Sequence, residues 1–456
     1  MNEDKKFQQT FTELKDFLDN NNSEAFREHF LDLHIYDQSR FFRDLDKSDR
    51  TKLYSILAPK EMADLFDLFD TDDMDVEPYL EEMNLDYTAE VFDEMYRDNA
   101  ADLVESLKPE KSREILAKMK PDNALQIKQI LHYDQDTAGS LMTTEFVSIS
   151  ANQTVKSAMT VLKAQAEEAE TIYYVYVIDD DDHLLGVVSL RALITSHDDT
   201  LVSDIYNDHH IVKVGTEEPQ DVLAQYFRDY DFLALPVVAN DDTLLGIVTV
   251  DDIIDVIDDE ASSDYSGLAG VDTDDISQNP LQAASKRLPW LITLLFLGMG
   301  TASLINHYED LVSKASILAV FISLITGTAG NAGTQSLAVA IRRIAMKEED
   351  RKGNSFGKMI FSELITGLIT GCITGITIFI IVGFWKHNLM LGIAVGVAMV
   401  CAITVANLAG SLIPIGMEKI GVDPAVASGP FISTMSDLTS VFIYFNIASL
   451  FMKFFI

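Results

Sequence analysis

Asp437 is the residue most suggestive of chemistry. It is an acid in the middle of the last apolar segment, residues 424–456. Crossing a bilayer takes about 20 apolar residues, so this segment is long enough to do so. A carboxylate at the centre of a bilayer costs about 2.5–3.5 kcal/mol on insertion scales, so it should face a partner or water. Polar side chains recur at helical spacing around it and form one stripe, made of Ser433, Ser436, Asp437, Ser440 and Tyr444. Two interpretations follow: the aspartate is sealed in a hydrogen bond between helices, or it lines a path for cations.

The negative charge of the chain is concentrated in its first 287 residues. The formal net charge is −38, and residues 288–456 contain nine acidic and ten basic residues, which leaves −39 for residues 1–287. Such a field repels nucleic acid and anionic lipid and concentrates cations. Cys372 and Cys401 both lie in apolar runs, so no disulfide framework is expected. The polar, acidic N-terminus predicts no cleavable signal peptide.

Residues 1–135 predict an all-α N-terminal domain. The first 138 residues contain no glycine, and their apolar residues recur at three- and four-residue spacing. Pro109 and Pro121 each follow a predicted helix end, where proline suits the first position of the next helix. This repeat of short helices indicates a superhelical stack. Asp98 and Asp102 lie four residues apart, so both carboxylates share one helix face.

Residues 136–258 contain an internal repeat, in which segment 175–189 matches segment 235–249. Each copy reads as a strand, a polar turn, a second strand and a helix. The pair resembles a tandem CBS-domain module, an α/β regulatory unit whose family often binds adenosine nucleotides such as ATP. That family holds the ribose with the acid of a Thr/Ser-x-x-Asp motif. The second copy has this motif, ending in Asp252, whereas the first has Ser189 and Ala192 at these positions and no acid.

An acidic connector joins the repeat to the apolar half of the chain. Residues 259–287 are expected to form a connector helix that continues the last helix of the repeat. Acidic side chains are frequent along this continuous helix, both at the end of the repeat and at the start of the connector: Asp251, Asp252, Asp255, Asp258, Asp259, Glu260 and Asp264. Like charges at such spacings repel by a few tenths of a kcal/mol per pair. Bound divalent cations would relieve the repulsion, and a solvated, salt-screened helix is the alternative.

Residues 288–456 form a predicted membrane domain with five transmembrane helices, expected at roughly 288–305, 316–341, 359–384, 389–417 and 425–456. Nine basic residues flank one side of these helices and three flank the other. Because positive residues favour the cytosolic side, the count predicts a multi-pass protein of the plasma membrane with residues 1–287 in the cytosol and the C-terminus outside. Segment 327–336 is rich in glycine and polar residues, which predicts a distorted backbone lining a wet cavity.

Three motifs together resemble those of the MgtE family of magnesium channels. They are DTAGSLM at 136–142, GNAGTQS at 330–336, and GVDPA at 421–425 followed by SDLT at 436–439. The resemblance covers essentially the whole chain, with the same order of domains. It implies a homodimer with a pore on the two-fold axis, in which Asp437 holds a hydrated Mg²⁺ ion. Mg²⁺ gives up water reluctantly, so facing carboxylates can select it through its waters. Ser433 and Ser440, one helical turn either side, are expected to line the path, with Asn331 from the second span.

The resemblance also implies that intracellular Mg²⁺ closes the pore by bridging acids on the N-terminal domain, the CBS pair and the connector helix. The acids to which this role is carried are Asp98, Asp102, Asp221, Asp231, Asp252, Asp255, Glu260, Asp264 and Asp423. At high Mg²⁺ these surfaces would come together and lock the connector helix against the pore.

Two other classes of function are weighed against a magnesium-gated channel. A Mg²⁺ exchanger coupled to Na⁺ or H⁺ would need further acids within the membrane, and Glu363 in the third span is the one nearby. An enzyme or receptor with a membrane anchor would need a P-loop, a His/Cys metal cluster or a nucleophile constellation, none of which the sequence contains. The sequence therefore predicts a transport protein and not an enzyme.

Overall fold

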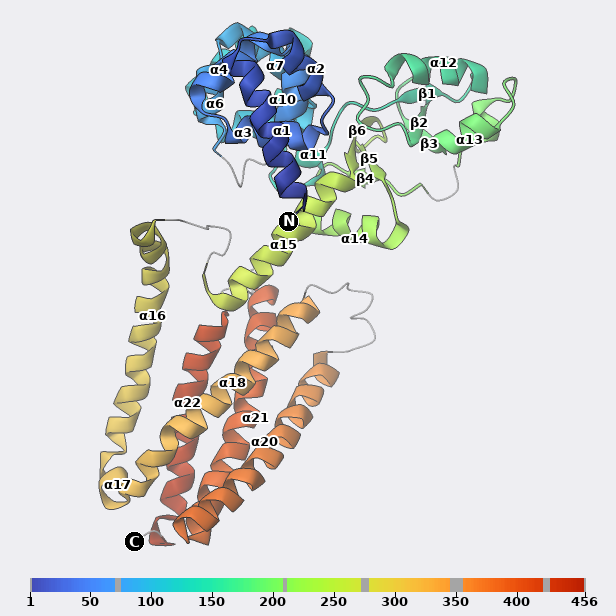
Figure 1. The fold of residues 1–456 in the computed structure, drawn as a ribbon. Helices are drawn as coiled ribbons and strands as arrows, with labels where there is room; N and C mark the ends of the chain where they lie inside the picture. Colours follow the sequence, from blue (N-terminus) through green and yellow to red (C-terminus); the bar gives the residue numbers. More distant parts are fainter. Residues whose placement is uncertain are drawn as a thin grey trace. The chain divides into compact units, whose positions relative to one another are not determined.

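The computed structural model describes residues 2–69, 75–207, 211–271, 279–344, 356–420 and 427–454 (Figure 1). The chain divides into two compact units, Met1–Ile257 and Asp258–Ile456. The first unit holds a helical domain followed by two small sheets, and the second is entirely helical in its described part.

Ten short helices form the first part of the first unit. Several of them pack on the helix two places further along the chain, as α3 does with α5, α5 with α7, and α8 with α10. Proline occupies the first turn of α5, α9 and α10, where its missing N–H is not needed. The core between the helices is rich in buried phenylalanine, including Phe26, Phe42, Phe66 and Phe92. The helices are α1 (Asn2–Asp19), α2 (Ser23–Leu31), α3 (Ile35–Asp44), α4 (Lys47–Ile56), α5 (Pro59–Phe66), α6 (Glu77–Glu82), α7 (Leu85–Glu94), α8 (Arg97–Ser106), α9 (Pro109–Lys118) and α10 (Pro121–Ile130).

The repeat folds into two three-stranded sheets of the same topology, which confirms the predicted CBS pair. In each sheet the first strand pairs in parallel with the second, and the second pairs antiparallel with the third. The isolated bridges Thr143↔Ile247 and His183↔Thr243 connect the two copies. The first copy contains α11 (Ala138–Leu141), β1 (Ser148–Ser150), α12 (Val155–Gln165), β2 (Tyr174–Ile178), β3 (Leu184–Ser189) and α13 (Leu190–Thr195). The second contains η1 (Val202–Asp204), β4 (Val214–Gly215), α14 (Gln220–Tyr230), β5 (Ala234–Val238) and β6 (Leu244–Thr249).

The connector helix differs from its predicted bounds of 259–287. Helix α15 runs over Val250–Ala269, so it begins directly after β6 and ends well before the first span. Gly270 ends it in the left-handed region, with φ of 69°, and the amide of Val271 donates to the carbonyl of Ser266 at 3.2 Å. Glycine reaches this region without steric cost and is the common helix terminator. Lys286 and Arg287, assigned to the connector from the sequence, belong to the next helix, α16.

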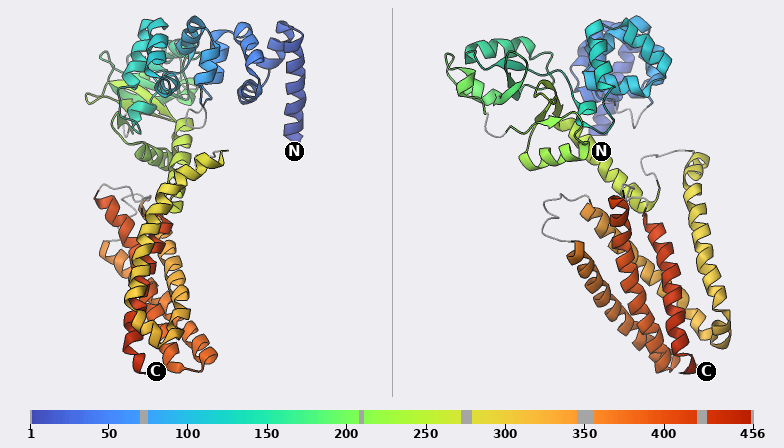
Figure 2. Two further views of the ribbon diagram at one scale, coloured as in Figure 1. Left: turned by 90° about the vertical axis from the view of Figure 1, so that its left-hand side faces the viewer. Right: turned by 180° about the vertical axis from the view of Figure 1, so that it is seen from behind.

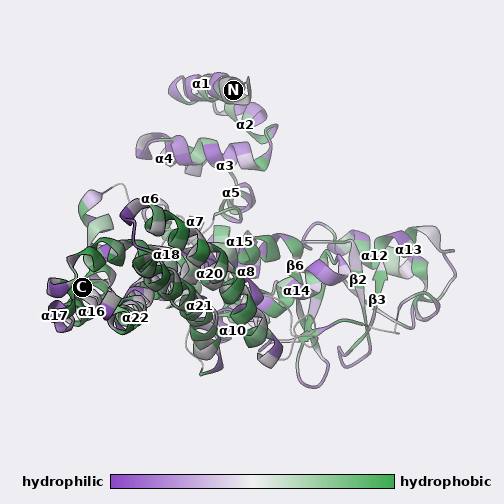
Figure 3. Cartoon of the chain, turned by 90° about the horizontal axis from the view of Figure 1, so that it is seen from below, coloured by the Kyte–Doolittle hydropathy of each residue, from purple (hydrophilic) through white to green (hydrophobic). Residues whose placement is uncertain are grey.

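The second unit is a bundle of long apolar helices (Figure 2). Among the described residues, four helical segments are long and apolar enough to cross a membrane: Pro280–His307, Ser316–Ile344, Gly357–Lys386 and Leu389–Met417. The predicted fifth span, 425–456, contains α22 (Gly429–Leu450), whose 22 residues extend about 33 Å but which is not among these four segments. Figure 3 shows α20 and α21 as predominantly hydrophobic. The elements are α16 (Pro280–His307), α17 (Glu309–Lys314), η2 (Ser316–Leu318), α18 (Ala319–Ile344), α20 (Phe356–Lys386), α21 (Leu389–Lys419), α22 and η4 (Met452–Phe454).

The backbone predicted to be distorted at 327–336 is instead a regular part of α18. Its glycines allow close helix packing: a Cβ on Gly333 would lie 2.9 Å from the Ser436 hydroxyl oxygen of α22. A Cβ on Gly410 of α21 would lie 2.2 Å from the Gly333 carbonyl oxygen. The prediction took a glycine-rich polar pattern as a sign of irregular backbone, whereas small residues also let intact membrane helices approach each other.

Candidate metal site and ion path

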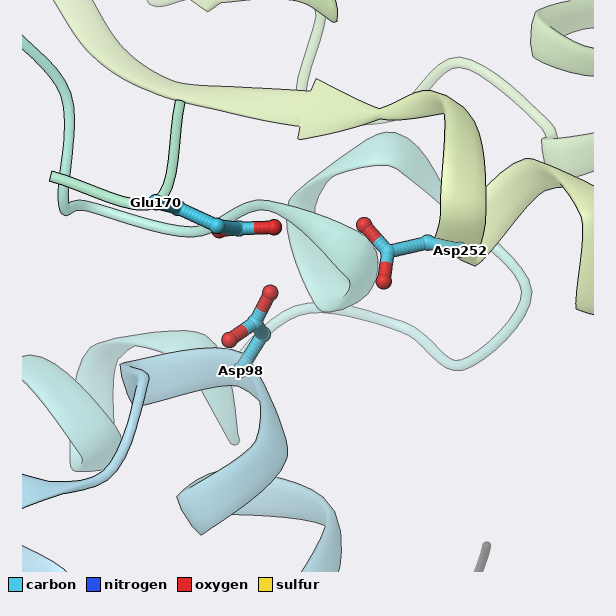
Figure 4. Close-up of side chains that lie close together, drawn as sticks. All are labelled: Asp98, Glu170 and Asp252. Carbon is cyan, nitrogen blue, oxygen red and sulfur yellow. The ribbon is translucent and has the colours of Figure 1, made fainter. Parts of the chain in front are cut away.

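Three carboxylates meet inside the first unit. Asp98 comes from α8, Glu170 from the loop before β2, and Asp252 from the first turn of α15, and one oxygen of each lies within 4.8 Å of the others. Figure 4 shows the three side chains pointing toward a common centre. They come from the helical domain, the first sheet copy and the second copy respectively, so the cluster depends on how these parts pack.

Local hydrogen bonds hold the segments that carry the three carboxylates. The Thr249 hydroxyl, at the end of β6, donates to Oδ2 of Asp252 at 2.6 Å. The main-chain N–H of Glu170 donates to the carbonyl of Glu145 at 2.9 Å. The carboxylate of Glu145 in turn pairs with Nε of Arg97 at 3.3 Å, and Arg97 directly precedes Asp98. Arg97 and Glu145 thereby tie the start of α8 to the loop that presents Glu170.

The electrostatics of the cluster are those of uncompensated negative charge. Burial and the charge of Asp252 raise the pKa of Asp98 well above its ordinary value. The same two causes raise the pKa of Glu170 to about 8, and burial raises that of Asp252 to about 6. The Glu170 Oε2 atom is buried and has no hydrogen-bond partner. Among the described residues no basic side chain pairs with any of the three, so protons or a cation must supply the missing positive charge.

The donor set of the cluster selects a class of cation. All of its side-chain ligands are carboxylate oxygens, without histidine or cysteine. Hard cations such as Mg²⁺ and Ca²⁺ prefer oxygen ligands, and Mg²⁺ commonly keeps several waters while binding one or two carboxylates. The arrangement can therefore hold a partly hydrated divalent cation between α8 and α15.

The structure brings together two of the predicted acids and adds one. Asp98 and Asp252 were expected to act in metal binding, and they are neighbours here. Glu170 was missed, because its loop carries no helical or strand periodicity that would aim its side chain. The run of acids at 167, 168 and 170 before a buried strand was the available signal, and it does not say which of the three turns inward.

The other predicted ligands form no further group of three within ligand distance in the described ranges. Asp102 is exposed one turn after Asp98. Asp231 is the left-handed C-cap of α14, with φ of 52°. Asp423 lies outside the described residues. The remaining members are exposed on the first turn of α14 or along α15: Asp221, Asp255, Glu260 and Asp264.

The predicted ion path lies on α18 and α22 of the second unit. Asp437 and Ser433 are partly exposed on α22 and Asn331 is exposed on α18. In the described part of the chain no hydrogen bond or ion pair joins Asp437 to another residue, so it is not sealed within the protomer. A pocket of about 480 Å³ lies one turn away, lined by Leu268, Thr334, Gln335, Ala338, Gly429, Pro430 and Ser433.

Ser440 does not share this surface. Its side chain is fully buried, and its hydroxyl has no hydrogen-bond partner among the described residues. Ser436 is likewise buried, against Gly333 of α18. The prediction that Ser440 lines the path with Asp437 is therefore corrected: this side of the polar stripe packs against neighbouring helices, because small hydroxyl residues suit tight helix contacts as well as water.

A second cavity lies between the two sheet copies. It measures about 320 Å³ and is lined largely by apolar and aromatic groups, among them Tyr174, Phe232 and Pro236. Ser189 and Ala192 of the first copy also line it, so the pocket borders the motif that lacks an acid. The acid of the second motif, Asp252, belongs instead to the carboxylate cluster.

Comparisons with known proteins agree with this organisation. Family matches cover residues 322–447 (MgtE, divalent cation transporter), 33–136 (MgtE intracellular N domain), and 138–197 and 202–259 (CBS domain). A relative described as magnesium transporter MgtE of Enterococcus faecalis is 64% identical over 456 residues, 100% of both chains. A crystal structure of the soluble part of a magnesium transporter matches at 53% identity and a TM-score of 0.55, covering 56% of this chain and 99% of the other. The cytosolic domain of an MgtE Mg²⁺ channel in complex with ATP matches at 31% identity and a TM-score of 0.50, over 54% and 99%.

The fold and its acids thus define a class, a multi-pass membrane transport protein whose polytopic helical domain is preceded by a helical domain and a CBS pair. The identity over the full chain makes the assignment definite: this chain belongs to the MgtE family of divalent cation transporters.

Proposed function

We propose that this chain transports Mg²⁺ across the plasma membrane and that cytosolic Mg²⁺ closes its path. The observation that carries the proposal is the cluster of Asp98, which is buried, with Glu170 and Asp252, which are partly buried; among the described residues none of the three has a basic partner. The relatives are described as magnesium transporters, which favours Mg²⁺ among the hard cations.

The cluster can act as a sensor because it includes the first turn of α15. Without a cation the three carboxylates repel one another, which favours separation of α8 from Asp252. A bound Mg²⁺ ion reverses the sign of this interaction and draws α8, the Glu170 loop and α15 together. The other acids of α8, α14 and α15, and Asp423 with them, would contribute weaker, more hydrated contacts. High internal Mg²⁺ would thereby fix the first turns of α15, whose later residues belong to the second unit.

The path itself is proposed at Asp437. In a homodimer two such carboxylates would face each other across the symmetry axis and hold Mg²⁺ through its waters, with Ser433 and Asn331 beside them. All five helices α16, α18, α20, α21 and α22 would cross the bilayer, with residues 1–287 in the cytosol and the C-terminus outside. Because Asp437 is partly exposed and unpaired, a channel is favoured over an exchanger coupled to Na⁺ or H⁺.

The transport experiment uses the full-length protein in liposomes. Mg²⁺ uptake should be lost in Asp437→Asn, and internal Mg²⁺ should inhibit the native protein but not Asp98→Asn. Glu114→Gln, an exposed acid on α9, is the matched control and should be inhibited like the native protein. Uptake by Asp437→Asn equal to native uptake would contradict the path, and inhibition of Asp98→Asn at native Mg²⁺ concentrations would contradict the sensor. Single-channel currents in planar bilayers distinguish a channel from an exchanger.

ATP is proposed as a ligand of the cavity between the sheet copies, since a related cytosolic domain is described in complex with ATP. The aromatic side chains of Tyr174 and Phe232 suit a purine base. Ala192 offers no carboxylate for the ribose hydroxyls. We therefore expect ATP and 2′-deoxy-ATP to bind the full-length protein with similar affinity, and Ala192→Asp to favour ATP. A strong native preference for ATP over the deoxy form would refute this account of the pocket.

A further inference from the structure

The second unit contains a buried acid that the ion path does not use. Glu363 lies on α20 and is 6% exposed. Its Oε1 atom pairs with the Arg343 guanidinium of α18 at 3.2 Å. Its Oε2 atom lies 3.3 Å from the Asn407 amide nitrogen of α21 and 3.2 Å from the Ser336 hydroxyl of α18. One carboxylate thus contacts two neighbouring helices.

The bonding around Glu363 is that of a group held in place from two sides. Arg343 supplies a counter-charge and the Asn407 amide supplies a donor. The Ser336 hydroxyl also lies 2.8 Å from the Asn407 carbonyl and 3.0 Å from the Ser411 hydroxyl, so the two serines extend the network along α21. An acid that carries a coupling ion must exchange its partners during transport, whereas both oxygens of Glu363 are engaged by the protein itself.

The network holds the part of α18 that packs against the turn carrying Asp437. Gly333, one turn before Ser336, lies so close to α22 that a Cβ there would come 2.9 Å from the Ser436 hydroxyl oxygen. A Cβ on Gly330 would lie 2.8 Å from the Ser433 hydroxyl oxygen. Ser433 and Ser436 both precede Asp437, by four residues and one residue, in the same part of α22. A shift of α18 relative to α21 would therefore be transmitted directly to the position of the Asp437 carboxylate.

We propose that Glu363 is a positioning residue for cation transport: it clamps α18 to α20 and α21 and thereby sets where α22 presents Asp437. The inference rests on the proposed role of Asp437 in the ion path. It assigns to Glu363 a geometric role and not the exchange of a coupling proton or sodium ion.

The test measures Mg²⁺ uptake by the full-length protein in liposomes as a function of external Mg²⁺ and of pH. Glu363→Gln keeps the side-chain volume but removes the negative charge beside Arg343 and replaces the carboxylate oxygen that accepts from the Asn407 amide by part of an amide. The Mg²⁺ concentration for half-maximal uptake should rise about fivefold or more, since groups in one network couple strongly. Glu309→Gln, an exposed acid on α17, is the matched control and should match the native curve.

Rescue distinguishes positioning from a loss of folding. In Glu363→Gln with Asn407→Asp the amide and the carboxylate exchange places, so the negative charge and the hydrogen bond both return. Half-maximal uptake should move back toward the native concentration. Ser336→Ala, a smaller change, should shift the concentration in the same direction as Glu363→Gln and serves if the charge variant is not produced in folded form.

Three results would overturn the proposal. The first is an unchanged half-maximal concentration in both Glu363→Gln and Ser336→Ala. The second is a Glu363→Gln variant in which only the maximal rate is reduced and the added Asn407→Asp substitution does not restore it. The third is a pH or Na⁺ dependence of native uptake that Glu363→Gln abolishes, which would make Glu363 a coupling group. Asp437→Asn in the same assay distinguishes failure of the proposed ion path from failure of the proposed clamp. Uptake by Asp437→Asn equal to native uptake would reject the ion path. Loss of uptake in Asp437→Asn, together with native uptake by Glu363→Gln, would reject only the clamp.

Discussion

Replacing Glu170 by glutamine should change how Mg²⁺ binding depends on pH. The pKa of Glu170 is raised to about 8 from an ordinary 4.5, and that of Asp252 to about 6. At pH 7 the metal-free cluster therefore retains protons, and a metal ion must displace them. Mg²⁺ affinity should rise as pH increases from 6 to 9, with protons released on binding. Glu170→Gln should reduce this rise above pH 7, because the carboxyl whose pKa is raised to about 8 is gone.

The size of the effect follows from the same values. A pKa of about 8 corresponds to about 4–5 kcal/mol of preference for the protonated carboxyl over its ordinary state. Two unit charges at 4.8 Å repel by about 3.5 kcal/mol at an effective dielectric constant of 20, which is the same order. Because the folded protein binds more protons than the unfolded chain between pH 4.5 and 8, its stability without Mg²⁺ must fall as pH rises through that window.

The assay is thermal unfolding of the full-length protein in detergent at pH 6 and pH 8.5, with and without Mg²⁺, together with calorimetric Mg²⁺ titration in two buffers of different ionisation enthalpy. Native protein should be stabilised more by Mg²⁺ at pH 8.5 than at pH 6, and Glu170→Gln should reduce that difference. Glu168→Gln changes an exposed acid of the same loop and should behave as native. Equal Mg²⁺ stabilisation at both pH values in native protein would refute the reasoning.

Three further changes test the packing around these sites. Thr249→Val removes the hydroxyl that donates to the Asp252 carboxylate of α15 and should cost about 1 kcal/mol of unfolding free energy, measured by denaturant titration; no loss would contradict a stabilising role of this hydrogen bond. Glu82→Gln leaves the partly buried Arg50 without its counter-charge and should cost about 3 kcal/mol by the same measurement, with native stability as the contrary result. Gly410→Ala places a methyl group against the Gly333 carbonyl and should lower the melting temperature of the membrane unit, which an unchanged melting curve would contradict.

The sequence predicted the order of the domains because periodicity and internal repetition depend on local chain geometry. It also placed Asp98 and Asp252 in metal binding, through a resemblance between motifs. It did not find Glu170, whose direction depends on a loop held by Glu145. Long-range packing of this kind leaves no period in the sequence, so spacing alone could not distinguish Glu170 from the exposed Glu168.

In the membrane unit, the sequence pattern did not determine what the small and polar residues contact. Small and polar residues on α18 and α22 were interpreted as irregular backbone and as lining of a wet path. The structure uses Gly333 for helix contact and buries Ser440 completely. Small residues serve both purposes, and the face that each one presents depends on which helices surround it. The predicted connector helix was likewise too long, because Gly270 ends α15 where acidic periodicity alone gave no stop.

The acids singled out here differ mainly in what compensates their charge, and this difference separates their roles. Glu363 has a guanidinium and an amide within hydrogen-bond distance, so an added cation would have to displace partners already in place. The cluster of Asp98, Glu170 and Asp252 has no basic side chain beside it in the described ranges, so burial makes these carboxyls prefer protons or a metal ion. Asp437 is not fully buried and pairs with no other described residue, which suits a group that must release its ion as readily as it binds it. Whether a site captures a cation depends on whether its negative charge is already balanced, and not on how many acids it contains. A basic side chain placed beside the proposed sensor should therefore abolish Mg²⁺ sensing, while transport through Asp437 continues.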